Sequence, residues 1–348
     1  MSQEERLMIL QMVADKKISA SEAAELLKAL DEKGAATPGA APPPPPKGAA
    51  PPNPPPPPFP SPGLGSGLSA FVEEIFDRAT GILGDFTGPR FEFPTEISGV
   101  FTSDQVPLRI FTGNGHVELK GWDEPGYKAS ILVKARGSSE AEARGRAADA
   151  YTVRATESGF ELEANRRYDW SEMTVSATLY LPKQKLYRLE SRTGNGHILV
   201  EGVNLIDGSG TSGNGRITVR GAAADRLYLK SGNGSIEIDG DVADLEAGTG
   251  NGSVKVIPLG RRSESMQLKT GNGSVVVDTG RLSREVGLHI DAHTGMGSVN
   301  INRNNLVYER QERNVGHKHV IARTPGYETA ERRVSIRART GLGSIAVE

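Results

Sequence analysis

The four-residue motif Ser/Thr-Gly-Asn-Gly recurs along this 348-residue chain and constrains its fold more than any other feature. Copies begin at residues 112, 193, 212, 231, 249, 270, 294 and 340, and the last two have Met296 and Leu342 in place of Asn. Between residues 193 and 270 the copies are 19, 19, 18 and 21 residues apart. A repeat of this period predicts a solenoid or array, in which neighbouring repeats complete one another's core.

Two ligand-binding interpretations of the Gly-Asn-Gly turn fail on the residues that follow it. A dinucleotide-binding loop needs a third glycine and a helix whose N-terminus holds the pyrophosphate. Here a strand-like segment such as "SIEI" follows, and no Lys-Ser/Thr pair makes a P-loop. The calcium β-roll repeat has Asp two positions after its last glycine, where this chain has an aliphatic residue such as Ile236. We therefore expect a structural turn.

Aliphatic residues alternate on both sides of each turn, which predicts strands with one buried face. In one repeat these residues are Leu227 and Leu229 before the turn and Ile236 and Ile238 after it. Burying four such side chains contributes roughly 6–12 kcal/mol, whereas ordering about 19 residues costs roughly 20–30 kcal/mol. A single repeat therefore needs neighbours. The fold class is mainly β, a β-helix-like solenoid of about 19-residue repeats, with a hairpin meander or sandwich as the alternative that Asn-Gly turns also allow.

Stacking of the repeats would align the turn asparagines in a hydrogen-bonded column, with the flanking glycines supplying positive φ at the corner. The members of this expected ladder are Asn114, Asn195, Asn214, Asn233, Asn251 and Asn272.

Three segments precede the repeat domain. Residues 1–33 have the apolar spacing of a helical hairpin too small to hold its own core, so it is expected to associate with a protein partner or a second copy. Residues 34–67 form a proline-rich linker, since 15 of the 22 prolines lie between residues 38 and 62, and an SH3-ligand role is the alternative to a plain spacer. Residues 68–86 predict an amphipathic helix, packed over the next domain or lying on a membrane surface.

The repeat domain covers residues 90–348 and has two insertions. The first, at about residues 122–190, contains strand-like runs and a short helix opened by Ser139 and Glu142, enough for an extra layer or cap. The second, at about residues 302–339, is locally basic. Its candidate anion-binding patch comprises Arg323, Arg332, Arg333 and Arg337, and plain solvated loop charge is the alternative.

Composition excludes several kinds of chemistry. The chain has no cysteine, which rules out disulfides, thiol nucleophiles and Cys-ligated metal, and its net charge of −2 favours neither nucleic acid nor an anionic membrane globally. The acidic N-terminus does not have the pattern of a Sec signal peptide, and no apolar run reaches the length of a membrane span. The expected location is cytoplasmic or peripheral to the cell envelope.

The sequence offers little support for catalytic or metal-binding residues. His289, His293, His317 and His319 could approach one another in the fold, but no acidic or Cys ligand accompanies them at a recognised spacing. His116 and His197 follow the turn at a position that Arg216 and Ser235 occupy elsewhere, which indicates surface variation. We expect no catalytic residue, no cofactor and no metal.

The repeated [Ser/Thr]-Gly-Asn-Gly-x-[Ile/Val]-x-aliphatic motif and the strand "MTVSATLYLPK" give residues 91–348 a resemblance to the bacterial "putative adhesin" family, a β-strand-repeat domain of unknown function. The segment "EERLMILQMVADKKISASEAAELLKAL" is similar to a SHOCT-like helical hairpin. The resemblance implies a non-enzymatic scaffold or binding protein linked to envelope stress or surface interactions. The basic insertion suggests an envelope or anionic polymer as a candidate ligand. The alternatives are a self-assembling, filament-forming protein and, less favoured, a β-helix carbohydrate-active enzyme.

Overall fold

The computed structural model describes residues 89–165, 172–261, 264–314 and 316–348. The expected helical hairpin (1–33), proline-rich linker (34–67) and amphipathic helix (68–86) lie outside these residues. The chain divides into two units, Met1–Gly65 and Ser66–Glu348, and all the described residues belong to the second.

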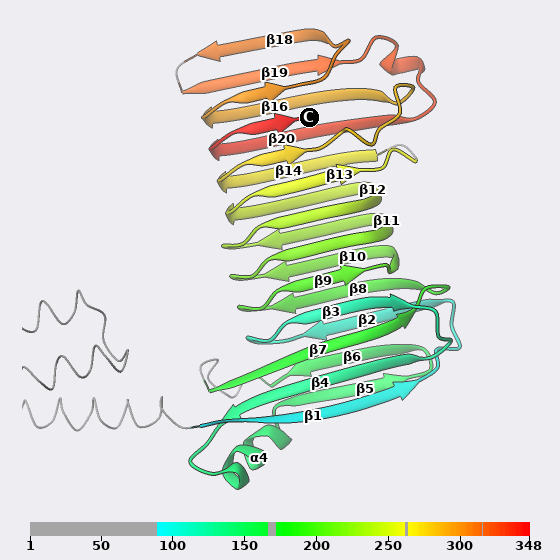
Figure 1. Cartoon of the computed structure of the whole chain (residues 1–348), viewed down its shortest axis with the longest axis vertical. Coiled ribbons are helices and arrows are strands. Elements are labelled where there is room, and N and C mark those ends of the chain that lie inside the picture. The colour runs from blue at the N-terminus through cyan, green and yellow to red at the C-terminus, as the bar shows by residue number, and fades with distance from the viewer. Residues whose placement is uncertain (1–88, 166–171, 262–263, 315) are drawn as a thin grey trace, which may run out of the picture. The chain divides into compact units, whose positions relative to one another are not determined.

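The described part is a solenoid (Figure 1). Each coil consists of a first arm, which is the strand before a Gly-rich corner, and a second arm, which is the strand after that corner. The strands that form only first arms are β2 (Gln105–Phe111), β8 (Leu186–Thr193), β10 (Asn204–Ser212), β14 (Glu264–Asn272), β16 (Gly287–Met296) and β20 (Arg333–Leu342). Those that form only second arms are β3 (Val117–Trp122), β9 (Ile198–Glu201), β13 (Val254–Pro258), β15 (Val275–Val277), β17 (Val299–Ile301) and β21 (Ile345–Val347).

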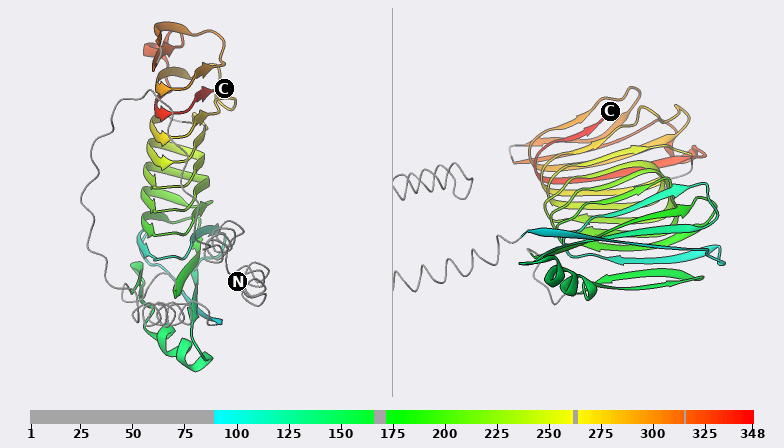
Figure 2. Two further views of the ribbon diagram at one scale, coloured as in Figure 1. Left: turned by 90° about the vertical axis from the view of Figure 1, so that its left-hand side faces the viewer. Right: turned by 60° about the horizontal axis from the view of Figure 1, so that its bottom comes forward.

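Two longer strands, β11 (Ile217–Ser231) and β12 (Ile236–Asn251), serve as the second arm of one coil and the first arm of the next. The first arms pair with one another in parallel and form one sheet, and the second arms form another. We call these the first sheet and the second sheet. The left view of Figure 2 shows them facing each other across a narrow interior. Leu229 lies beside Ala247 of the next coil, not Ile238 of its own, so the solenoid prediction is confirmed over the hairpin meander.

The interior between the sheets holds the alternating aliphatic residues that the sequence predicted. Leu227, Leu229, Ile236 and Ile238 are at most 3% exposed, and the equivalent residues of the other coils are buried with them, except in the end coil, where Val299 and Ile301 are partly buried. Each coil covers the apolar face of its neighbours, which is the mutual support that a single repeat lacks.

Strand β1 and the first insertion together build an antiparallel cap at the N-terminal end of the stack. Strands β1 (Arg90–Gly99), β4 (Tyr127–Arg136) and β7 (Met173–Pro182) extend the second sheet beyond β3, and β5 (Tyr151–Thr156) and β6 (Gly159–Ala164) extend the first sheet beyond β2. Helix α4 (Glu140–Ala148) packs against β4 and β1. Its N-cap is Ser139, whose hydroxyl accepts a hydrogen bond from the amide of Glu142.

The second insertion reverses the order of the last two coils. The coil formed by β16 and β17 does not lie next to β14 and β15 but one coil further along the stack. The chain then continues into the hairpin β18 (Val307–Asn314) and β19 (His317–Arg323), which caps the end of the first sheet. A 3-10 turn (η1, Tyr327–Thr329) then leads back, and β20 and β21 fill the empty position between β14–β15 and β16–β17. The final coil is therefore the seventh of eight in space.

No helix within the described residues is long and apolar enough to cross a membrane.

Candidate functional site

The second glycine of each motif is required because neighbouring coils approach closely at the corner. A Cβ atom on Gly196 would lie 1.9 Å from the carbonyl oxygen of Gly115, and one on Gly215 would lie 1.8 Å from that of Gly196. The expected positive φ occurs at only four of the eight second glycines, Gly252, Gly273, Gly297 and Gly343, where φ is 141–158°. The expectation that φ explains these glycines is therefore wrong for half of the coils, where the space between backbones explains them.

The Ser or Thr that opens each motif after the first ties its coil to the neighbouring one, whereas Thr112 of the first motif donates to Gly115 of its own coil. The Ser231 hydroxyl donates to the Gly215 carbonyl at 2.9 Å, and the Thr249 hydroxyl donates to the Gly234 carbonyl at 2.8 Å. These hydroxyl residues are at most 7% exposed, so their hydrogen bonds satisfy polar groups that would otherwise be buried without a partner. The repeat pattern alone did not indicate this role for the Ser and Thr residues.

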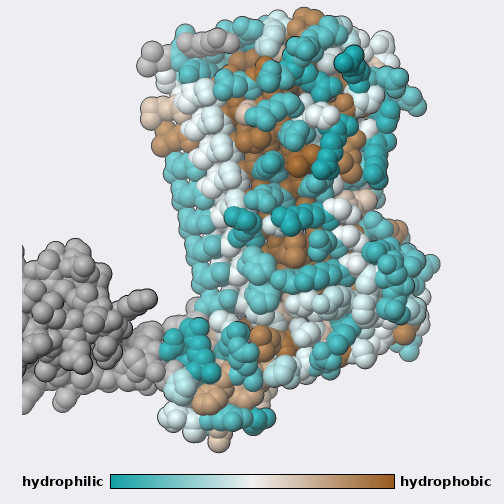
Figure 3. All heavy atoms as spheres, in the orientation of Figure 1, coloured by the Kyte–Doolittle hydropathy of each residue, from teal (hydrophilic) through white to brown (hydrophobic). Residues whose placement is uncertain are grey.

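The six asparagines form a column of side-chain hydrogen bonds along the corner. Each amide nitrogen donates to the side-chain oxygen of the preceding asparagine, at 2.6 Å from Asn233 to Asn214, 2.7 Å from Asn251 to Asn233 and 2.8 Å from Asn272 to Asn251. The same contact joins Asn114, Asn195 and Asn214. The column continues in register into Leu342 and Met296, which are 47% and 61% exposed. Figure 3 shows a hydrophilic column along this edge, with hydrophobic atoms at its upper end.

The outer face of the first sheet carries a row of aligned side chains that a partner could reach. The residue directly before each Ser/Thr points outward and aligns with its counterparts from coil to coil. In spatial order these residues are Phe111, Arg192, Thr211, Lys230, Gly248, Lys269, Arg339 and His293. Four of these eight residues are cations, and we call them the basic row: Arg192, Lys230, Lys269 and Arg339. None of the eight positions holds an acidic residue.

An open groove of about 640 Å³ runs along the same face over β2, β8, β10, β11, β12 and β14. It lies beside the basic row, and its outward residues include Arg109, Glu190, Ser209, Tyr228, Glu246 and Gln267, which are neighbours across successive strands. Tyr228 is 41% exposed in the middle of this face. The groove therefore offers an aromatic ring between charged groups over several coils.

Ion pairs across this face are exposed and weak. Arg192 contacts Glu190 at 2.7 Å and Lys269 contacts Glu246 at 3.8 Å. Pairs of this kind contribute about 0–1 kcal/mol and exchange readily for an external anion. Within the described part of the chain, Lys230 and Arg339 have no carboxylate partner.

The four arginines of the expected anion patch have local partners. Arg323 contacts Glu309 at 2.6 Å and Glu328 at 3.4 Å, and Arg337 contacts Asp291 at 3.5 Å. Arg332 donates to the carbonyl oxygen of Gly260, and Arg333 begins β20 beside Gly287. Carboxylates thus offset the charge of Arg323 and Arg337. The cations of the basic row have fewer carboxylate contacts, so they are more available to an external anion.

Two of the histidines lie together on the outer face of the second sheet. His116 and His197 stack with ring centroids 4.9 Å apart, and His197 contacts Glu118 at 3.1 Å. Burial, and then the nearby His197, lowers the pKa of His116.

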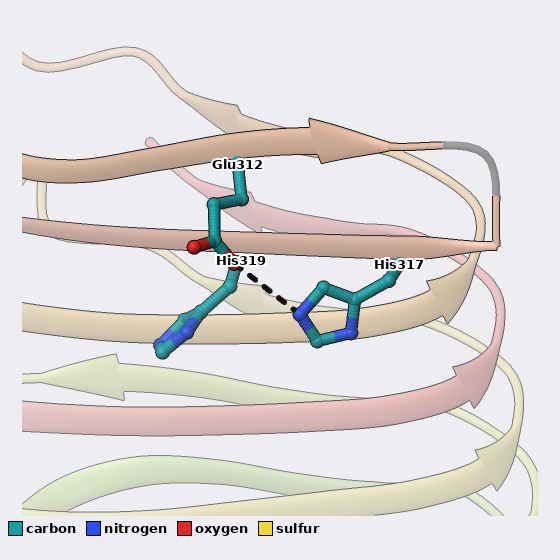
Figure 4. A group of neighbouring side chains, drawn as sticks. All are labelled: Glu312, His317 and His319. Carbon is teal, nitrogen blue, oxygen red and sulfur yellow. Dashed lines mark ion pairs between the residues drawn. The ribbon is translucent and has the colours of Figure 1, made fainter.

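The C-terminal cap brings a second group of histidines together. Cross-strand pairing aligns His293 of β16, His319 of β19 and Glu312 of β18 in one row on the outer face of the first sheet, and His317 lies two residues from His319. His293 and His317 are 3.0 Å apart, and His317 and Glu312 are 3.5 Å apart (Figure 4). Burial, and then His317, lowers the pKa of His293. His289 packs instead against Tyr327, with ring centroids 5.6 Å apart.

Two family matches cover separate parts of the chain. Residues 140–314 match the family described as Toastrack DUF4097, and residues 4–35 match a SHOCT-like domain. None of the curated proteins matches the chain.

Solved structures with a similar arrangement are distant in sequence. A "putative cell adhesion protein" from Clostridium sporogenes is 14% identical, with 73% of this chain and 99% of that chain covered and a TM-score of 0.36. A "putative adhesin" from Bacteroides fragilis is 11% identical, with 75% and 97% covered and a TM-score of 0.32. A "putative lipid binding protein" from Parabacteroides distasonis is 10% identical, with 74% and 96% covered and a TM-score of 0.28. Similarities of this size carry no information about a ligand.

Proposed function

The chain belongs to the Toastrack DUF4097 family, and we propose that it is a non-enzymatic scaffold that binds an extended, acidic polymer along the outer face of its first sheet. The observation that carries this proposal is the basic row beside the open groove. The corner motif supports it indirectly, because its Asn and Ser/Thr side chains are hydrogen-bonded between coils and its glycines lie close against the neighbouring backbone. The side chains that point outward are therefore the ones available to bind a partner.

The spacing of the basic row suits a polymer better than a small anion. Its four cations stand on coils two, four, six and seven of the stack. Neighbouring strands are about 4.8 Å apart, so the cations lie about 10, 10 and 5 Å from one to the next. No compact anion spans about 24 Å, whereas an extended chain with regularly spaced phosphate or carboxylate groups contacts all four. An envelope polymer of this chemistry is the candidate ligand class.

The filament-forming alternative is less favoured because capping strands cover both ends of the first sheet and the N-terminal end of the second sheet, whose other end is β17. The edge strand β18 has the sequence VYERQERN, and its exposed charges discourage addition of another strand. At the other end, β1 includes Pro94, Glu92 and Glu96. The proposed role of the SHOCT-like hairpin remains association with a protein partner or a second copy.

Charge reversal on the two faces tests the proposal. We expect the double variant Lys230→Glu/Arg339→Glu to bind poly-L-glutamate or polyphosphate roughly thirtyfold more weakly than the wild type. The four unit changes in charge, at about 0.5 kcal/mol each, sum to about 2 kcal/mol. Affinity is measured by isothermal titration calorimetry at low salt, and should fall as salt screens the charges.

The matched control is Arg216→Glu/Lys255→Glu, which changes the net charge equally on the outer face of the second sheet. Its affinity for the polymer should stay within about twofold of wild type, since these side chains lie across the solenoid from the basic row. Equal losses in the two double variants would mean that net charge alone drives binding, and the proposed surface would be wrong.

A further inference from the structure

The row of titratable side chains at the C-terminal cap has the composition and the hydrogen bonding of a metal site. Glu312, His317 and His319 each offer one ligand atom, and these three atoms lie within 4.8 Å of one another. Figure 4 shows Glu312 reaching from β18 toward the two histidines of β19. Two imidazoles and a carboxylate are a donor set typical of zinc bound to proteins.

The hairpin register explains how these residues meet. Glu312 lies directly opposite His319 in the β18–β19 pair, and His317 and His319, two residues apart, share one face of β19. Opposite side chains in an antiparallel pair have Cβ atoms about 4.5–5.5 Å apart, which is within reach of a common ion. Sequence spacing gave no sign of Glu312, because the turn of the hairpin brings it into place.

Each candidate ligand has a second partner that orients it. The Nε2 atom of His319 contacts Asp291 at 2.8 Å, which leaves Nδ1 available, and Asp291 in turn contacts Arg337. The Nδ1 atom of His317 contacts His293 at 3.0 Å, which leaves Nε2 facing Glu312. Outer partners of this kind fix the tautomer and ring orientation of metal-binding histidines.

Glu312 is arranged in the same way. Its Oε1 accepts a hydrogen bond from Arg310 at 2.8 Å, and its Oε2 faces His317 at 3.5 Å.

The side chain of Glu312 is 37% exposed and that of His317 is 46% exposed, so an ion can enter from solvent. Zinc–ligand bonds of about 2.0–2.2 Å put tetrahedral ligand atoms about 3.4 Å apart. The three atoms therefore need to close by up to about 1.4 Å, which half-exposed side chains achieve by small rotations.

We propose that Glu312, His317 and His319 form a binding site for a divalent transition-metal ion such as Zn²⁺. Asp291, His293 and Arg310 are its positioning residues. Three protein ligands leave the fourth coordination position to water or to a donor atom from a partner. A bound ion would hold β18 against β19 at the capped end of the stack. The inference departs from the expectation of no metal, and it stands independently of the polymer-binding proposal.

The test is calorimetric titration of the tag-free full chain with ZnCl₂. We expect one ion per chain, and at least about tenfold weaker binding in Glu312→Gln and in His317→Gln. Both substitutions replace partly exposed, outward side chains, and two separate variants keep the test valid if one folds poorly. Thermal unfolding without metal checks that each variant keeps the wild-type stability.

His197→Gln is the matched control, because His197 is also an outward histidine near a glutamate but lies on the second sheet. It should bind zinc as the wild type does. Titration with CoCl₂ should give visible absorption bands that are lost in the two site variants and kept in the control. Absence of zinc binding to the wild type, or equal affinity in the wild type and both site variants, would overturn the proposal.

Discussion

Gly215→Ala is expected to lower the free energy of unfolding by roughly 2–4 kcal/mol, because its methyl group would overlap the backbone of the preceding coil. The new Cβ would lie 1.8 Å from the Gly196 carbonyl oxygen, and this oxygen belongs to a backbone that is itself held by the corner hydrogen bonds. Relief requires two coils to move apart, at the expense of the parallel pairing between them. Urea unfolding followed by circular dichroism measures the loss.

Two other glycines separate the possible causes of this effect. Gly202 has φ +63° and open space around its Cβ position, so Gly202→Ala should cost only about 1–2 kcal/mol, from backbone conformation alone. Gly145 lies inside α4 with nothing within 4 Å, so Gly145→Ala should stabilise by about 0.5–1 kcal/mol. If Gly215→Ala cost no more than Gly202→Ala, close approach of the coils would not explain the motif.

Deletion of residues 333–348 should destabilise the coil that precedes them in sequence, because β20 and β21 fill the position between β14–β15 and β16–β17. The deleted strands bury Val334, Ile336, Ile345 and Val347 completely. At about 1.5–3 kcal/mol each, these side chains contribute roughly 6–12 kcal/mol. We therefore expect residues 287–301 to lose their protection from amide hydrogen exchange along with the deleted strands.

The same exchange experiment contains its own control. Strands β11 and β12 lie two or more coils away from the deletion, so their amides should keep most of the protection seen in the full chain. If residues 287–301 kept full protection too, β16 and β17 would pack directly on β14 and β15, and the stacking order described above would be wrong.

The repeat architecture was predictable because its information is local. Each coil carries its own corner motif and its own alternation of aliphatic residues, so the β-solenoid and the family resemblance could be inferred, and both are confirmed. The helix cap at Ser139 was readable for the same reason, since a capping box spans four residues.

The order of the last two coils was not predictable from local pattern. Every coil presents a similar aliphatic face to its neighbours, so the copies at residues 294 and 340 are nearly interchangeable as partners for β14. The path of the insertion between them decides which copy takes which position. That path depends on how the β18–β19 hairpin packs against β16, which is a property of the tertiary structure.

The candidate binding residues on the outward surfaces could be predicted from the sequence only in part. The basic row could have been found from the sequence, because the residue before each Ser/Thr must point outward if the Ser/Thr points inward. The predicted anion patch instead rested on a local density of arginine, and it comprised Arg323, Arg332, Arg333 and Arg337. The approach of Glu312 to His319 had no sequence signal, because it depends on the register of one hairpin.

The most direct test of the account is to locate the bound polymer on the wild-type protein by lysine acetylation footprinting. Lys230 and Lys269 lie on the basic row, and Lys255 lies on the outer face of the second sheet. With saturating poly-L-glutamate, we predict that Lys230 and Lys269 become several-fold less reactive while Lys255 reacts as in the free protein. Equal protection of Lys255, or unchanged reactivity at Lys230 and Lys269, would contradict the claim that the outer face of the first sheet is the binding surface.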